Sequence, residues 1–101
     1  MSENVFEILD KTGRKIRLTK ERWGHITSPE SLHPYITNYL EEVKQTLEKP
    51  EVIVCNKYDD MKANYYKFLK ERKQYLLVAV KYLNGDGFIT TSFITRRIKK
   101  R

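Results

Sequence analysis

The stretch QYLLVAVKYL-NGDG-FITTSFIT, from Gln74 to Thr95, is the most strand-like part of the chain. Both of its arms are rich in β-branched and aromatic residues, which suit a pleated and partly buried surface. The Asn, Gly and Asp residues of the central NGDG supply the positive φ angles that a tight hairpin turn needs. The sequence therefore predicts a β-hairpin at the centre of a sheet, with the rest of the chain arranged around it.

The N-terminal half predicts a small hairpin followed by two helices. Residues 5–9 and 15–18 alternate in polarity across a turn signal, which predicts a β-hairpin, and its few apolar side chains predict a peripheral position. Thr19 suits the N-cap of a short helix over residues 20–26, because its hydroxyl can accept from a free backbone N–H. A second helix is predicted over residues 34–48, where apolar residues recur at helical spacing.

The C-terminal half predicts strands only. Strands are expected over residues 51–56 and 64–70, and short turns join them to each other and to the central hairpin. Short turns connect antiparallel neighbours. The expected fold class is therefore α+β, with the N-terminal β-hairpin and two helices packed on one face of a four-stranded antiparallel sheet. Cys55 follows three apolar residues and is expected to be a buried strand thiol.

Length and composition narrow the classes of function. The 101 residues predict a single domain, residues 1–101, that ends in a basic tail over residues 96–101. No apolar run is long enough to cross a membrane and the N-terminus lacks a signal-peptide pattern, so a cytoplasmic location without a membrane partner is expected. One cysteine and two histidines give no zinc spacing, and no metal or other cofactor is expected. The net charge of +7 suits a nucleic acid or an acidic protein as partner, with a generically soluble basic protein as the alternative.

Strand register determines which side chains face away from the helices. Regular pairing across NGDG puts Lys81, Thr90 and Ser92 on this open face, together with Ala79, Leu77 and Ile94. The same pairing turns the more apolar set toward the helices, namely Tyr82, Val80, Val78, Ile89, Thr91 and Phe93. A three-residue turn at 72–74 adds Tyr65 and Lys67 to the open face and buries Tyr66 and Phe68, whereas a two-residue turn exchanges these pairs. Cations, aromatic rings and hydroxyls on one face suit phosphates and bases, and a solvated sheet face is the alternative interpretation.

The two histidines are candidates for proton transfer. His25 and His33 are the only side chains expected to titrate near neutral pH. Metal-free RNA cleavage needs a base for the 2′-hydroxyl proton, an acid for the leaving 5′-oxygen, and cations on the phosphate. Arg22 and His25 lie three residues apart on one polar helix face. A structural histidine is the alternative interpretation for each of them.

Three segments carry a resemblance to a known family. The first segment is LTKERWGHI, which begins at Leu18. The second comprises the His33-Pro34 pair and the later run TLEKPEVI. The third is YYKFLKERKQYLLVAVKYLNGDGFITTSFIT, which ends at Thr95. Together they resemble the phage-type barnase–EndoU–colicin–RelE-like nucleases over nearly the whole chain. Members of that superfamily have helices followed by a four-stranded antiparallel sheet, which agrees with the fold expected from the patterns alone.

The resemblance implies metal-independent RNA cleavage through a 2′,3′-cyclic phosphate, in a phage, toxin or mobile-element setting. Carried over by position, the motif residues are His25, His33, Tyr66, Lys67, Thr90, Thr91, Ser92 and Thr95. In the implied catalytic site His25 is general base or acid, with His33 completing the pair. Lys67 and Lys81 clamp the phosphate, and Thr90 or Ser92 orients an oxygen. The residues expected to contact substrate are Arg22, His33, Tyr65, Tyr66, Thr91 and Thr95. No glutamate stands obviously beside these groups.

The leading hypothesis is therefore a small endoribonuclease, with RNA as substrate and an acidic antitoxin or immunity protein as candidate partner. One alternative is a basic nucleic-acid-binding module without chemistry. Another is a phage-encoded regulator that docks on a protein through the basic tail. A disordered, solubilising tail is the simpler interpretation of residues 96–101, and it predicts that their removal leaves nuclease activity intact.

Overall fold

The computed structural model describes residues 3–31 and 34–98. The elements follow in the order β1 (Asn4–Leu9), β2 (Lys15–Thr19), α1 (Lys20–Thr27), the 3-10 helix η1 (Pro34–Tyr39), α2 (Leu40–Glu48), β3 (Val52–Cys55), β4 (Lys62–Leu69), β5 (Gln74–Tyr82) and β6 (Asp86–Thr95). The expected α+β class and the order of its elements are confirmed. The second predicted helix begins as the 3-10 segment and becomes α-helical at Leu40.

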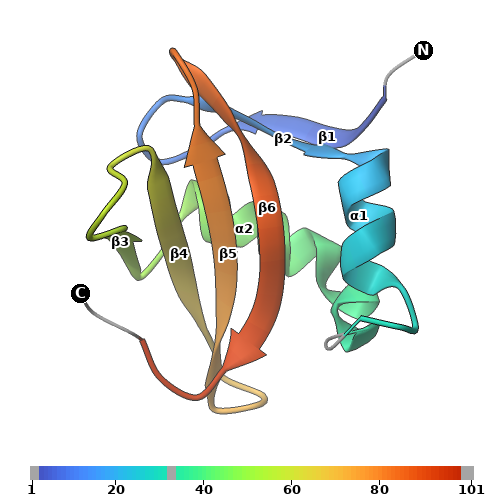
Figure 1. Cartoon of the computed structure of the whole chain (residues 1–101). Coiled ribbons are helices and arrows are strands. Elements are labelled where there is room, and N and C mark those ends of the chain that lie inside the picture. The colour runs from blue at the N-terminus through green and yellow to red at the C-terminus, as the bar shows by residue number, and fades with distance from the viewer. Residues whose placement is uncertain (1–2, 32–33, 99–101) are drawn as a thin grey trace.

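The strands form one six-stranded sheet in the order β1-β2-β6-β5-β4-β3 (Figure 1). The last four strands pair antiparallel, as expected. The expectation of a four-stranded antiparallel sheet was nevertheless wrong, because β2 adds the N-terminal hairpin through parallel pairing of Lys15 with Asp86 and Arg17 with Phe88. Gly87 permits this close approach, since a Cβ there would lie 2.7 Å from the Lys81 carbonyl oxygen and 3.1 Å from Ile16 Cδ1.

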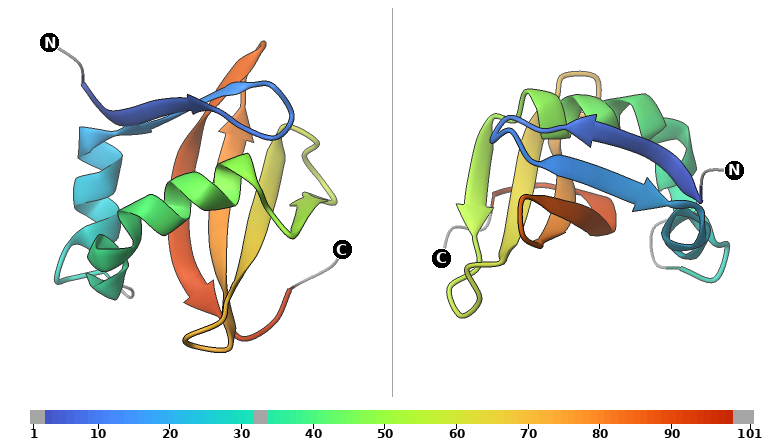
Figure 2. Two further views of the ribbon diagram at one scale, coloured as in Figure 1. Left: turned by 180° about the vertical axis from the view of Figure 1, so that it is seen from behind. Right: turned by 90° about the horizontal axis from the view of Figure 1, so that it is seen from above.

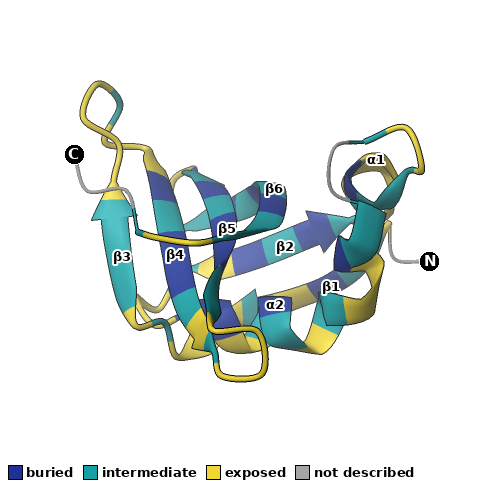
Figure 3. Cartoon of the chain, turned by 90° about the horizontal axis from the view of Figure 1, so that it is seen from below, coloured by how far each residue is buried: buried dark blue, intermediate teal, exposed yellow. Residues whose placement is uncertain are grey.

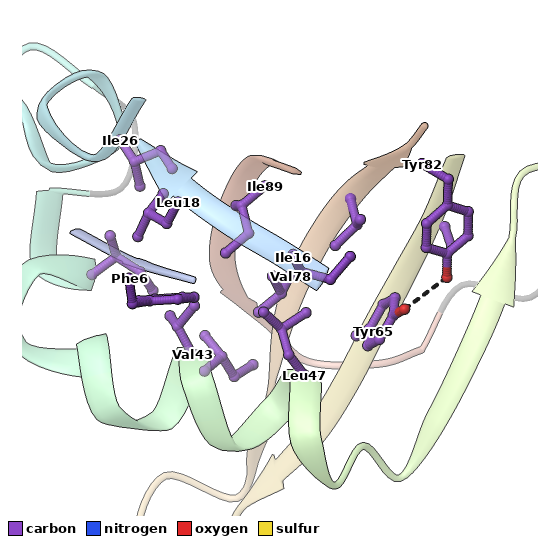
Figure 4. Close-up of a cluster of buried hydrophobic side chains, with 14 residues drawn as sticks. Phe6, Ile16, Leu18, Ile26, Val43, Leu47, Tyr65, Val78, Tyr82 and Ile89 are labelled. Atoms are coloured by element: carbon purple, nitrogen blue, oxygen red, sulfur yellow. Dashed lines mark hydrogen bonds between the residues drawn. The ribbon is translucent and has the colours of Figure 1, made fainter. Parts of the chain in front are cut away.

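The N-terminal hairpin is part of the core and not peripheral. Ile16 and Leu18 are fully buried, and with Phe6 they join the cluster that α2 supplies with Val43 and Leu47 (Figure 4). The buried residues of β2, Ile16 and Leu18, lie two positions apart and so share one face of the strand. The sequence prediction failed because it judged the hairpin by the number of its apolar residues.

The two α-helices occupy different places. Seen from behind, α2 crosses β4, β5 and β6 and covers that face of the sheet (Figure 2). In contrast, α1 lies beside the edge of β6 where β2 has diverged (Figure 1). The predicted N-cap is confirmed, since the Thr19 hydroxyl accepts from the Arg22 N–H at 3.0 Å.

A β-bulge changes the register of the central hairpin. Near the turn Val80 pairs with Ile89, but after the bulge Ala79 pairs with Thr91 and Val78 with Ser92. Ser92 is therefore buried on the helix side, where its hydroxyl donates to the Leu77 carbonyl at 2.7 Å. The predicted open position of Ser92 and the predicted core positions of Thr91 and Phe93 were wrong, because one extra residue reverses every later side chain.

The register of β4 is also the reverse of the main expectation. Leu69 pairs with Gln74, which leaves a loop of four residues, 70–73. An even number of loop residues, in place of the expected three, directs each side chain of β4 to the opposite face of the sheet. Tyr65 and Lys67 consequently lie on the side of α2, and the expectation that they face outward was wrong. Tyr66 is buried on the opposite face, paired with Leu77. We call the face turned away from α2 the open face.

Tyr65 is tied to a buried polar network at the edge of the core. Its hydroxyl donates to the Asp10 carboxylate and lies 2.7 Å from the Tyr82 hydroxyl (Figure 4). Burial, reinforced by the hydrogen bond to Asp10, raises the pKa of Tyr65, and burial raises the pKa of Tyr82. Both phenols are held neutral, which suits a structural role.

Exposure is concentrated in the loops, while the outer strand β3 is half-buried up to its last residue (Figure 3). Cys55, at the end of β3, is exposed, so the expectation of a buried thiol was wrong. The reason is that β3 is an edge strand of only four residues, with Cys55 at its last position.

Candidate active site

A groove runs between α1 and β6. One part of it, about 230 Å³, is lined by Arg22, His25, Ile26, Ser31, Thr90, Thr91 and Ser92. The adjoining part, about 400 Å³, is lined by Thr19, Glu21, Arg22, His25, Phe88 and Ile89. Arg22 and His25 border both parts, so we treat them as one feature, the α1–β6 groove.

The helix supplies the ionisable side of this groove. Arg22 and His25 are three residues apart and lie on the same side of α1, while Ile26 points into the core. Glu21 stands one turn before His25, with its Oε1 atom 3.9 Å from His25 Nε2. The side chains of His25 and Glu21 are 69% and 87% exposed, so both are accessible to a ligand.

Strand β6 supplies the hydrogen-bonding side. The Thr90 hydroxyl donates to the Ala79 carbonyl at 3.3 Å across the bulge. The Ile94 N–H donates to the Tyr35 hydroxyl at 3.1 Å, so at this position the backbone of β6 points away from β5. Strand geometry repeats every second residue, so the Ser92 N–H points the same way, although Ser92 as a whole is only 1% exposed.

Five of the predicted site residues meet at this groove, namely Arg22, His25, Thr90, Thr91 and Ser92. The other predicted residues do not converge on it. His33 lies outside the described residues. Thr95 ends β6 and donates to the Arg97 carbonyl at 3.4 Å.

The two lysines expected to clamp one phosphate lie on opposite faces of the sheet. Lys67 lines a hollow on the helix side with Gln45, Glu48 and Lys49 of the end of α2. Lys81 lies on the open face, where its ammonium group donates to Asp59 at 3.0 Å. Tyr65 is fully buried in the core between α2 and the sheet. The side chain of Tyr66 is directed to the opposite face of the sheet but is also fully buried there. Neither tyrosine therefore has an exposed surface that substrate could contact.

Glu21 is the residue that the sequence reasoning missed. It precedes His25 by four positions, a spacing that places two side chains together on a helix. Both residues fall inside the predicted helix over residues 20–26, so this signal is present in the sequence. The expectation that no glutamate lies beside the histidine was wrong.

Within residues 3–31 and 34–98, no group of three or more histidine, cysteine, aspartate or glutamate side chains is arranged to hold a metal ion. No helix of these segments is long and apolar enough to cross a membrane.

The α+β fold thus brings a histidine, an arginine and a carboxylate together beside β6. The chain is matched over residues 3–101 by the family model described as phage-Barnase-EndoU-ColicinE5/D-RelE like nuclease2. It therefore belongs to that family, and the predicted resemblance is confirmed. No curated protein and no solved structure matched the chain.

Proposed function

We propose that the protein is a metal-independent ribonuclease whose reaction takes place in the α1–β6 groove. The observation that carries this proposal is the meeting of His25 and Arg22 from one helix with Thr90, Thr91 and Ser92 from the last strand. Membership of a nuclease family supports the general class of reaction.

The proposed chemistry is transesterification of RNA. A base takes the proton of the 2′-hydroxyl, the 2′-oxygen attacks phosphorus, and the bond from phosphorus to the 5′-oxygen breaks. The 5′-oxygen receives a proton, and a 2′,3′-cyclic phosphate remains. His25 is the proton-transferring group, as base or acid, and the adjacent Glu21 supplies a second proton acceptor within 3.9 Å.

Arg22 binds the phosphate in this scheme. A guanidinium can contact two phosphate oxygens at once, and the charge that develops in the transition state strengthens these contacts. The Thr91 hydroxyl adds a donor on the opposite wall. The net charge of +7 attracts the polyanionic substrate from a distance.

The same charge suits an acidic protein inhibitor of the antitoxin or immunity type, and the family description supports a phage or toxin setting. We propose both as the biological context of the activity, with the cytoplasm as its location.

The test is cleavage of a labelled single-stranded RNA in the presence of EDTA. We expect cleavage of RNA, no cleavage of DNA of the same sequence, and products that carry a cyclic phosphate. Replacing the 2′-hydroxyl at the cleaved position by a 2′-O-methyl group should block the reaction there.

The variants His25→Gln and Arg22→Ala should each lower kcat by about a hundredfold or more, since each removes a group that acts in the transition state. Lys67→Ala is the matched control, because this lysine lines a separate hollow at the end of α2, and it should keep the wild-type rate. Full activity of His25→Gln, with folding checked by circular dichroism, would show that the proposed site is wrong.

A further inference from the structure

A second hollow lies on the open face and meets the α1–β6 groove at Thr90. Its volume is about 360 Å³, and the ends of β3 and β4, the loop between them and the bulge of β6 form its walls. Thr90 lines both this hollow and the groove. A chain-like ligand with one unit in the groove can therefore place its next unit in this hollow, which we call the Asn64 hollow.

An amide side chain without a partner lines this hollow. Asn64 pairs with Val54 on one side and Ala79 on the other, and the small Ala79 leaves space beside it. Within the described segments the Asn64 side chain makes no hydrogen bond, and it is not sealed from solvent. An amide offers donors and an acceptor together, which complements the donor and acceptor pattern along the edge of a nucleobase.

The charges around the hollow favour an anion. Lys62 lines the hollow and pairs directly with Lys81 on the neighbouring strand, and like charges at such positions destabilise a sheet. Asp59 accepts from Lys81 at 3.0 Å, but Lys57 adds another cation to the wall. Lys57 and Lys62 line the hollow and form no ion pair among the described residues, so a net positive charge remains beside the Asn64 amide.

An amide for a base edge and cations for a phosphate are the two elements that a nucleotide requires. Resting on the ribonuclease function proposed above, we propose that the Asn64 hollow binds the nucleobase next to the cleaved phosphodiester. The Asn64 amide contacts the edge of that base, and Lys57 and Lys62 contact the neighbouring phosphate. Asn64 is then a residue that determines base specificity, while the reaction itself takes place at His25.

The first test measures base preference. RNA substrates that differ only in the base on either side of one cleavable linkage are compared by kcat/KM. The wild-type protein should prefer one base on one side of that linkage by about tenfold to a hundredfold, the discrimination expected from paired hydrogen bonds to a base. Asn64→Ala should remove this preference by slowing cleavage of the preferred substrate.

Two further variants sharpen this test. Asn64→Asp keeps the size of the side chain and removes its donors, so it should shift the preference toward a different base. Asn38→Ala removes an exposed asparagine of η1 and should leave the preference unchanged. A wild-type protein without base preference, or a preference that survives in a folded Asn64→Ala variant, overturns the proposal.

The second test does not depend on cleavage. Binding of the four ribonucleoside monophosphates to the His25→Gln variant is measured by calorimetry, with and without Asn64→Ala. One nucleotide should bind most tightly and lose about tenfold in affinity with the second substitution. If Asn64→Ala weakens nucleotide binding but the wild-type protein cuts no RNA, the proposed ribonuclease function is refuted and the proposed base site stands. If the wild-type protein cuts RNA but Asn64→Ala leaves nucleotide binding unchanged, the proposed base site is refuted and the proposed ribonuclease function stands.

Discussion

At the scale of single residues, Asp10 accepts four hydrogen bonds through its carboxylate. One carboxylate oxygen accepts from the Thr12 N–H, the Thr12 hydroxyl and the Arg14 N–H, and the other accepts from the Tyr65 hydroxyl. Asp10 thereby holds the turn of the N-terminal hairpin and attaches it to β4. Tyr65 belongs to this internal network and not to the substrate site expected for it.

Tyr65→Phe should lower the free energy of unfolding by about 1–3 kcal/mol, because it leaves a buried Asp10 oxygen without its donor. Urea denaturation followed by circular dichroism measures the change. Tyr58→Phe, at a tyrosine that is 89% exposed, is the control and should have little effect. The rate of RNA cleavage by Tyr65→Phe should match that of the wild type at a temperature where both are folded. A loss of activity in the folded variant would show that Tyr65 contributes to the substrate site.

The same tyrosine predicts a pH dependence. Its pKa is raised in the folded state above the ordinary 10.0, so the folded protein holds the phenol proton more tightly than the unfolded chain does. Its contribution to stability is complete below pH 10 and is lost as pH rises toward the folded pKa. The wild-type urea midpoint should therefore fall more steeply above about pH 10 than that of Tyr65→Phe. Parallel curves would contradict this assignment.

At the scale of elements, the N-terminal hairpin contributes to the core through alternate residues. Leu18 is fully buried and Leu9 of the same hairpin is 62% exposed. Leu18→Ala should destabilise the protein by about 2–5 kcal/mol, while Leu9→Ala should change stability by less than about 0.5 kcal/mol. Thermal and urea unfolding of the two variants provide the measurement. Equal losses of stability in the two variants would show that burial of Leu18 does not account for the contribution of the hairpin to the core.

The basic C-terminal segment contacts the sheet before the described chain ends. Ile98 lines a hollow with Glu51, Val52 and the edge-to-face pair of Phe68 and Tyr75. Removing residues 96–101 should lower the free energy of unfolding by about 1 kcal/mol, since it uncovers part of this apolar surface. The cleavage rate at saturating RNA should stay unchanged, as expected for a segment outside the groove. A tenfold loss of that rate would instead assign the segment to substrate binding.

At the scale of the whole molecule, 20 lysine and arginine residues exceed 13 acidic ones. Arg22, Lys57 and Lys62 are the cations proposed to contact phosphates, and each contact with single-stranded nucleic acid releases counterions. The plot of log affinity against log salt should therefore have a slope of about −2, measured by fluorescence anisotropy with His25→Gln.

Arg22→Ala in the same background should reduce that slope by about 0.7. Lys44→Ala is the control, because Lys44 on α2 is paired with Glu41 at 3.5 Å, and it should leave the slope unchanged. An affinity independent of salt would mean that phosphates are not bound by these residues.

The kinds of elements and their order follow from the amino-acid sequence alone, because the signals for them are local. Thr19 caps α1 through a bond to a residue three positions later, and the NGDG turn joins adjacent strands. The spacing of Arg22 and His25 likewise puts them on one side of a single helix. The family resemblance rested on the same local motifs, and it is confirmed over residues 3–101.

The faces that these elements present depend on tertiary contacts. The pairing of β2 with β6 joins residues about seventy positions apart, and nothing local specifies it. The bulge beside Ala79 and the four-residue loop after Leu69 each shift a strand by one position, which exchanges its two faces. For that reason Ser92, Tyr65 and Lys67 lie where the sequence patterns did not place them. The physical cause is the two-residue period of a strand, which turns a one-residue difference in a loop or bulge into a complete reversal.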